Sequence, residues 1–357
     1  MKVFSNLTNY QPSHRYPLNN IIKSLWNESN QEQRRQVYGE WVDLYQYEPD
    51  ITKADLCLLT YQWPYYVNQG LISQAQEEVR AAQQHGKPLV IFSAGDSSAN
   101  VPFQDVILFD GSAVRPLPSL RYLSAQPPYT ADYLEQYCAG QLQVRPKRAL
   151  ARIGFCGQAS TSPLQGAWRS LRLKVQQSQY KRGKRKWQPP PFETTSFRTQ
   201  VLRQFDYQPG LETDYLLRSR YHAGDLRDKQ AQALAKRQFV ENILGTDYTV
   251  CMRGGGNFSV RFYETLCLGR IPVFINTGCV LPFDDQIPYH EIFPWVELDQ
   301  LENAAQIVRD FHARLTGEDF EGLQRRCRAL WEEHMTPTGF HRDFVSRFIN
   351  FPHDKKI

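Results

Sequence analysis

Short apolar runs alternate with amphipathic stretches through the first third of the chain. Four runs predict strands: MKVFSNL, ADLCLLTY, KPLVIFSAGD and DVILFDGSAV. Between the second and third, LISQAQEEVRAAQQHGK has the apolar spacing of a helix, and Gly86 is a natural C-terminal stop. Near-continuous apolar runs such as LVIF are typical of strands covered on both faces. Because a strand–helix–strand order favours parallel pairing, this part predicts a layered α/β domain.

The same alternation resumes at Arg152. ARIGFCG predicts the first strand of a second α/β unit, and the strands DYTVCMR and RIPVFIN follow later. Helices are predicted at LRDKQAQALAKRQFVENIL, VRFYETLCL, QLENAAQIVRDFHARL and EGLQRRCRALWEEHM, with Gly245 and Gly269 ending the first two. We therefore expect an N-terminal α/β domain over residues 1–149 and a second α/β domain over 150–335. Residues 336–357 would form a helix that packs back toward the first domain.

Composition and charge narrow the functional classes. The chain has 357 residues, of which 41% are hydrophobic and 22% charged, as in soluble globular proteins. A net charge of +5 suits an anionic ligand or an acidic membrane surface, and it is too small to argue for nucleic acid. The seven cysteines occur without a CxxC pair, which indicates a reducing compartment. The sequence shows no apolar leader and no membrane span. We therefore expect a cytoplasmic protein, and association with the inner face of the membrane would be compatible with this.

Glycines and charges concentrate in the stretch RGGGNFSVRFYETLCLGRIPVFI, between a predicted strand and a predicted helix. Ligands of parallel α/β sheets bind beyond the carboxyl ends of the strands, where this loop lies. Glycines at 254, 255 and 256 (Gly254, Gly255 and Gly256) would let the backbone approach a ligand and expose amide donors. The following helix offers an anion-binding N-terminus, which Asn257 or Ser259 would cap.

Charged side chains around the glycines favour a phosphorylated ligand. Arg253 and Arg261 would donate charge-assisted hydrogen bonds to phosphate oxygens. Glu264 is three residues after Arg261, on the same side of the helix, and suits the two hydroxyls of a ribose. The triple glycine matches neither GxGxxG nor GxxxxGK[ST]. Taken alone, an Arg261–Glu264 salt bridge beside a flexible turn explains the charges nearly as well.

The span RFYETLCLGRIPVFINTGCVLPFDD resembles the exostosin-like glycosyltransferase family. It shares an arginine, a helical glutamate, a small residue and a glycine, followed by an Ile-Pro-Val strand and a Leu-Pro-Phe turn. The segments RIGFCG, TDYLLRSRYHAG and DYTVCMRGGGNFS are also similar to the second domain of that family, so the resemblance covers roughly residues 150–300. It implies a GT-B architecture, in which two Rossmann-like α/β domains face each other across the active site. It also implies an inverting, metal-independent transferase in which Arg261 and Glu264 bind the nucleotide-sugar donor.

An inverting transfer needs a base that takes the proton of the acceptor hydroxyl. Asp96, at the end of KPLVIFSAGD, is the first candidate, because a strand end should face the cleft. Capping of its own turn is the alternative for Asp96, and Asp110 after VILF is a rival base. Arg218 and His222, in LLRSRYHAG, are expected to contact donor or acceptor, with a structural histidine as the alternative for His222.

Three further features have two interpretations each. Tyr61 and Trp63, in TYQWPYYV, would stack on a sugar or pack in the core. Asp284–Asp285, in LPFDDQ, are adjacent acids but form no DxD, and a surface turn explains them better than a metal site. The basic residues Lys181–Lys186 predict a mobile, solvated loop, or a basic flap that contacts a diphosphate or an anionic acceptor. No nucleic-acid fold motif accompanies them.

The combined expectation is a glycosyltransferase that uses a nucleoside diphosphate sugar, UDP-linked in the first instance, without a cofactor or metal. Its acceptor would be a glycan or a lipid-linked glycan in cell-surface or secreted polysaccharide or glycolipid synthesis. Peripheral membrane association would fit, and nucleic acid would not be a partner. The alternatives are a fucosyltransferase-like GT-B enzyme with a GDP-sugar donor, and a non-catalytic nucleotide-sugar-binding protein.

Overall fold

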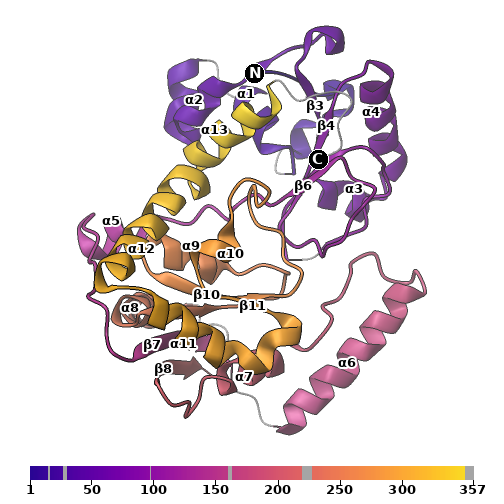
Figure 1. Cartoon of the computed structure of the whole chain (residues 1–357). Coiled ribbons are helices and arrows are strands. Elements are labelled where there is room, and N and C mark those ends of the chain that lie inside the picture. Colours follow the sequence, from indigo (N-terminus) through magenta and orange to yellow (C-terminus); the bar gives the residue numbers. More distant parts are fainter. Residues whose placement is uncertain (15–16, 27–29, 97, 160–162, 219–226, 350–357) are drawn as a thin grey trace.

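The computed structural model describes residues 1–14, 17–26, 30–96, 98–159, 163–218 and 227–349. Within these ranges the strands form two separate sheets, and every pairing between neighbouring strands of a sheet is parallel (Figure 1). This arrangement of two parallel α/β sheets is the predicted fold class.

The first sheet has the strand order β2-β1-β3-β4-β5-β6. Its strands are β1 Lys2–Phe4, β2 Gln46–Tyr47, β3 Leu56–Leu58, β4 Leu89–Ser93, β5 Ile107–Asp110 and β6 Tyr122–Ser124. The five residues of β4 and the four of β5 are all buried, as expected of strands covered on both faces. The associated helices are α1 Asn20–Trp26, α2 Gln31–Tyr38, α3 Trp63–Gln69 and α4 Ile72–Gln84, with short 3-10 turns at Leu7–Asn9, Pro12–His14, Glu40–Leu44 and Ile51–Lys53.

The second sheet has the strand order β11-β10-β9-β7-β8. Its strands are β7 Ala151–Gln158, β8 Leu211–Arg218, β9 Tyr248–Cys251, β10 Ile271–Asn276 and β11 Trp295–Glu297. The helices of this half are α6 Pro163–Lys181, α7 Thr194–Arg203, α8 Lys229–Gly245, α9 Val260–Cys267, α10 Tyr289–Ile292, α11 Ala304–Arg314 and α12 Gly317–Leu330, with a 3-10 segment at Leu298–Asn303 and a π-helical segment at Trp331–Met335. Because β7 pairs with both β8 and β9, the loops after these three strands meet at one edge of the sheet.

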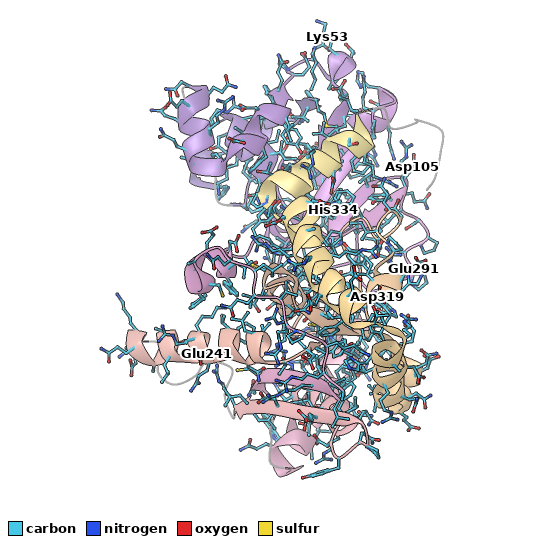
Figure 2. The ribbon with its side chains drawn as sticks, turned by 60° about the vertical axis from the view of Figure 1, so that its left-hand side comes forward. Lys53, Asp105, Glu241, Glu291, Asp319 and His334 are labelled. Atoms are coloured by element: carbon cyan, nitrogen blue, oxygen red, sulfur yellow. The ribbon has the colours of Figure 1, made fainter. Side chains whose placement is uncertain are left out.

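Helix α13, Pro337–Phe348, leaves the second half of the chain and packs on the first sheet. The imidazole of His341 stacks on Trp41 at 3.8 Å between ring centroids, and its Nδ1 lies 2.8 Å from the hydroxyl of Tyr45. Phe344 contacts Phe92 and Phe109 of the first sheet, at 6.0 and 5.4 Å between centroids. Figure 2 shows these C-terminal helices running along the length of the molecule, with His334 labelled between α12 and α13.

Part of the connection that precedes β7 packs on the second half of the chain. Helix α5, Tyr133–Cys138, lies beside α8 and α9 of the second half (Figure 1). The Asp132 carboxylate accepts hydrogen bonds from the Arg328 guanidinium on α12 at 2.6 and 2.9 Å. The backbone N–H of Tyr133 points at the thiol of Cys267, 3.3 Å away. These contacts place a first-half helix next to α9, which matters for the site below.

Helix α6 is an element that the sequence analysis did not predict. It covers Pro163–Lys181, so that of the basic residues Lys181–Lys186, predicted to form a loop, only Lys181 is helical. After Pro163 and Gly166 near its start, the sequence of α6 has no helix breaker before Gly183, and glutamine, lysine, arginine and leucine are good helix formers. The loop is therefore confined to the residues that follow Lys181.

Candidate functional site

A cleft of about 680 Å³ lies at the edge where β7, β8 and β9 end, and we call it the main cleft. Several elements contribute to its wall: the ends of β7 and β8, the loop after β9, and the helices α7, α8 and α9. The lining side chains that carry charge are Asp96, Arg198, Arg218, Lys236, Arg261 and Glu264. Among the described residues, four cations against two carboxylates give this cleft the electrostatic character that favours an anionic ligand.

The loop after β9 brings the glycines to the main cleft, all three of which line it. None of them has a positive φ, so the need for glycine comes from space rather than from backbone conformation. A Cβ on Gly256 would lie 2.6 Å from Oγ of Ser112 and 2.7 Å from the Phe258 ring. A Cβ on Gly254 would meet its nearest neighbour at 3.7 Å, an ordinary contact. A side chain at Gly256 would therefore require Ser112 of the first domain and Phe258 of the loop itself to shift.

Asn257 holds this loop against both halves of the protein. Its side-chain amide donates to the carbonyl oxygens of Ala113, at 2.9 Å, and Gly278, at 3.1 Å. Its Oδ1 accepts from Arg253 at 3.0 Å and from the Thr277 hydroxyl at 2.7 Å. The side chain is buried and these bonds occupy its polar atoms. Asn257, predicted as a donor contact, thus acts on the loop as a brace in this structure.

Arg253 is buried and does not line the main cleft. Its guanidinium lies over the Phe192 ring, 5.6 Å from the centroid, and donates to Asn257. It faces a second cavity of about 70 Å³, the small cavity, whose wall also includes Asp96 and Arg185. Burial lowers the pKa of Arg253 from its ordinary value, since desolvation disfavours the charged form.

Helix α9 directs its first turn at the main cleft. Ser259 occupies the N-cap position, but its side chain makes no cap hydrogen bond, contrary to the predicted capping role. Arg261 donates from Nη2 to the carbonyl oxygen of Cys156 at 2.7 Å, and its guanidinium lies 4.1 Å from the Phe155 ring centroid. A Cβ on Gly157 would come within 2.8 Å of that Nη2 atom, so a glycine at the end of β7 makes room for the arginine.

Glu264 is held by two residues that the sequence did not single out. Its Oε1 atom accepts from the Tyr133 hydroxyl at 2.8 Å and from the Lys236 ammonium at 3.0 Å. The ammonium also lies 4.2 Å from the centroid of the Tyr133 ring. Glu264 is mostly buried and lines the main cleft, and its Oε2 accepts no hydrogen bond from the described residues. The carboxylate is therefore fixed through one oxygen and has the other available for a ligand.

The contacts of Glu264 do not include the Arg261–Glu264 salt bridge that was the alternative explanation of these charges. Glu264 forms its ion pair with Lys236 of α8, while Arg261 donates a hydrogen bond to the end of β7. Arg218, at the end of β8, donates to the carbonyl oxygen of Ala235 at 2.8 Å and lines the same cleft. Arg198 on α7 donates to the carbonyl oxygen of Gln158 at 3.1 Å. Backbone carbonyls thus position three of the cleft arginines.

Asp96 lies where the first domain meets the glycine loop. It is exposed, lines both the main cleft and the small cavity, and its Oδ2 lies 3.6 Å from the position of a Cβ built on Gly255. Within the described part of the chain its carboxylate accepts no hydrogen bond, so capping of its own turn does not occupy it. The rival Asp110 is buried and accepts from the Ser112 backbone N–H and the Ser98 hydroxyl, and burial raises the pKa of its carboxyl to about 6.

The remaining candidates lie elsewhere. Tyr61 and Trp63 are both buried in the core of the first domain and line neither cavity, which is the packing alternative. Tyr61 accepts from the backbone N–H of Gln11 at 3.2 Å, and Trp63 packs edge-on to Phe103. Because both rings are buried, neither can stack on a sugar. His222 lies outside the described residues.

The adjacent acids lie in a turn, as predicted, with Asp285 exposed, and they also make contacts between the two halves of the chain. Asp284 accepts two hydrogen bonds from one Nη atom of Arg115, at 2.7 and 2.9 Å. Asp285 accepts from the Tyr122 hydroxyl at 2.7 Å and pairs with Arg347 of α13. The two carboxylates therefore join the second half of the chain to the first sheet and to the C-terminal helix.

The basic run after α6 lies against the first domain. The ammonium of Lys186 donates to the Val67 carbonyl oxygen at 2.9 Å, and the Gln188 N–H donates to that of Ser98 at 3.1 Å. Arg185 lines the small cavity beside Asp96. The segment thus runs close to the candidate base, and its mobility without ligand stays a prediction.

Comparisons with known proteins agree with the sequence resemblance. No family model matches the chain. The chain is 28% identical over 130 residues to a probable glucuronosyltransferase from Oryza sativa subsp. japonica and, equally, to a probable β-1,4-xylosyltransferase from Arabidopsis thaliana. Each match covers 33% of this chain and only 30% of the plant protein. The resemblance to exostosin-like glycosyltransferases is thus confirmed as a likeness over a third of the chain.

One further comparison is with a solved glycosyltransferase structure. A crystal structure of a glycosyltransferase from Rickettsia africae ESF-5 covers 83% of this chain and 76% of its own, with 9% identity and a TM-score of 0.34. At that score the likeness carries no argument about the site.

In the described ranges, no helix combines the length and apolar character required to cross a membrane.

Proposed function

We propose that the chain is a glycosyltransferase that moves a sugar from a nucleoside diphosphate sugar to a hydroxyl of a glycan acceptor. The observation that carries the proposal is the main cleft, where Arg261 and Glu264 line the cleft one turn apart on α9 beside a glycine loop. The Oε2 atom of Glu264 is available to accept hydrogen bonds from ligand hydroxyls. The plant relatives, named for glucuronosyl and xylosyl transfer, make those two sugars the first to test.

The charges of the cleft suit the departure of a nucleoside diphosphate. Negative charge grows on the leaving diphosphate as the glycosidic bond to the donor sugar breaks. Arg261, held by the Cys156 carbonyl, and the first backbone N–H groups of α9 would stabilise that charge. The Arg218 guanidinium would add a second cation from the end of β8. Because these groups supply positive charge, we propose a reaction that needs no bound metal.

The acceptor would enter from the side of the first domain. Asp96 faces the glycine loop from there, and its carboxylate would take the proton of the attacking hydroxyl. The acceptor oxygen then forms its bond to the anomeric carbon on the face opposite the leaving diphosphate, which inverts the configuration. We propose a UDP-linked donor and a glycan or lipid-linked glycan acceptor of polysaccharide or glycolipid synthesis.

A thermal-shift panel of nucleotide sugars and nucleoside diphosphates tests this proposal. A ligand at about 100 times its dissociation constant should stabilise the fold by roughly 2.7 kcal/mol. UDP-sugars are expected to raise the melting temperature more than GDP-sugars, and the stabilising donor should then be consumed in the presence of glycan acceptors. Stabilisation by GDP-fucose alone would point to the fucosyltransferase-like alternative. Donor binding without transfer to any acceptor would favour a binding protein, and the absence of any nucleotide effect would overturn the proposal.

A further inference from the structure

Helix α6 presents apolar side chains to solvent on the outside of the molecule. Trp168, Leu171 and Val175 expose 63%, 62% and 51% of their surface. Their spacing of three and four residues puts them on one face of the helix, where they form a continuous stripe. We call these three residues the α6 stripe. Figure 1 shows α6 apart from the two sheets, beyond α7.

The opposite side of the helix attaches it to the protein. Gln177 donates from its amide to the carbonyl oxygens of Pro190 and Pro191, at 2.8 and 3.1 Å. Arg169 lies 4.0 Å from the Glu193 carboxylate, and Leu173 on this side is buried. Since this side accounts for the anchoring of α6, the stripe is not needed to hold the helix in place.

Basic side chains flank the α6 stripe. Arg172 and Lys174, both exposed, fall on its two sides by helical periodicity, and the Arg172 guanidinium lies 6.0 Å from the Trp168 ring centroid. Toward the end of the helix, residues 181, 182 and 184 add three exposed cations. From Pro163 to Phe192 the sequence contains eight lysines and arginines and no aspartate or glutamate. The segment that carries the α6 stripe therefore contributes only positive charges to the surface around it.

We propose that α6 is an interfacial helix that docks the protein on an anionic lipid surface. An apolar stripe with tryptophan and leucine between rows of cations is the pattern of helices that lie in the plane of a membrane interface. The stripe would enter the boundary between headgroups and acyl chains, and the cations would contact acidic headgroups. A polyanion such as RNA would attract the cations but would give the α6 stripe no apolar phase to enter, so the lipid surface fits both features.

The docked position has a consequence for the small cavity. The segment that leaves α6 reaches the first domain at Val67 and Ser98 and places Arg185 beside Asp96. The chain that leaves the docked helix would thus connect the membrane-bound α6 directly to the wall of the small cavity. The docking itself does not depend on transferase activity and is measured without any donor or acceptor.

The experiment is co-sedimentation of the full chain with vesicles of phosphatidylcholine, with and without phosphatidylglycerol. We expect the wild-type protein to bind the vesicles that contain phosphatidylglycerol, and the combined variant Trp168→Ser, Leu171→Ser and Val175→Ser to bind them about tenfold or more weakly. Arg172→Gln and Lys174→Gln should each weaken binding about fivefold. Circular dichroism and thermal unfolding of each variant confirm that the fold is intact, as expected for exposed positions.

A matched control removes three apolar side chains of similar or greater exposure elsewhere: Val37 at 63%, Tyr207 at 102% and Leu234 at 58%. Replacing these three by serine should leave vesicle binding unchanged. The proposal is overturned if wild type and the stripe variant bind equally, if wild type does not bind, or if neutral vesicles are bound as tightly as anionic ones. It is also overturned if wild type binds no vesicles but forms dimers that the stripe variant lacks, or if it binds RNA in place of vesicles.

Discussion

Replacing Glu264 by glutamine tests the assignment of the main cleft with the least disturbance of the fold. The amide keeps the shape of the side chain and an oxygen that accepts from the Tyr133 hydroxyl, but it removes the negative charge. If a ribose binds at Oε2, the loss of a hydrogen bond to a charged group costs about 1.5–3 kcal/mol. Donor affinity should therefore fall about 10- to 150-fold, at 1.4 kcal/mol for each tenfold.

The folded protein should lose much less. The Lys236 side chain is 37% exposed, so its ion pair with Glu264 contributes about 0.2–1 kcal/mol to the free energy of unfolding. Isothermal titration with a stabilising nucleotide sugar measures the affinity, and urea unfolding measures the stability. The matched control is Tyr133→Phe, which removes the other hydrogen bond to Oε1 without changing the charge or Oε2. A glutamine variant that binds donor as tightly as wild type would refute the reasoning.

Three further predictions concern the base, the loop and metal dependence. Asp96→Asn should keep donor affinity and melting temperature while transfer slows by about 100-fold or more, and an unchanged turnover of the folded variant would exclude the base. Gly256→Ala should lower the free energy of unfolding by about 1–3 kcal/mol because its Cβ meets Ser112 at 2.6 Å, whereas Gly254→Ala should have little effect, and equal losses in urea unfolding would contradict this steric account. Turnover should persist in EDTA because arginines supply the positive charge, and a loss that manganese restores would disprove metal independence.

Seven of the described strands were predictable because they depend on local patterns, namely β1, β3, β4, β5, β7, β9 and β10, whereas β2, β6, β8 and β11 were not predicted. Fully apolar runs such as LVIF in β4 mark strands buried on both faces, and strand–helix alternation implies parallel pairing. Helix α6 was not predicted, since its outward face carries Trp168 and Leu171 while a glutamine makes its contacts on the inner face. An inverted pattern of this kind cannot be distinguished by periodicity from a polar loop with scattered apolar residues.

The candidate site, like the fold, was predictable from the sequence only in part. The glycine loop and the residues on α9 are contiguous in the chain, so the end of β9 and the start of one helix were sufficient to bring them together. The roles within the loop were not accessible, because they depend on what lies across from it. Asn257 donates to Ala113, and Arg253 turns to the small cavity, only because the first domain is packed there. A sequence motif locates a loop but does not determine which of its side chains face a ligand.

Tyr133 and Lys236 show what limits the prediction of a binding site. They reach the same carboxylate oxygen of Glu264 from α5 and α8, although Tyr133 is 131 residues away in the chain. A tyrosine in a helix is normally assigned to the core and a lysine to the solvent, so neither residue type signals a role. Their role follows from burial, because a mostly buried carboxylate needs a cation or hydrogen-bond donors. A buried acid at a strand–loop–helix junction therefore predicts that such partners exist, and only the packing of distant helices identifies them.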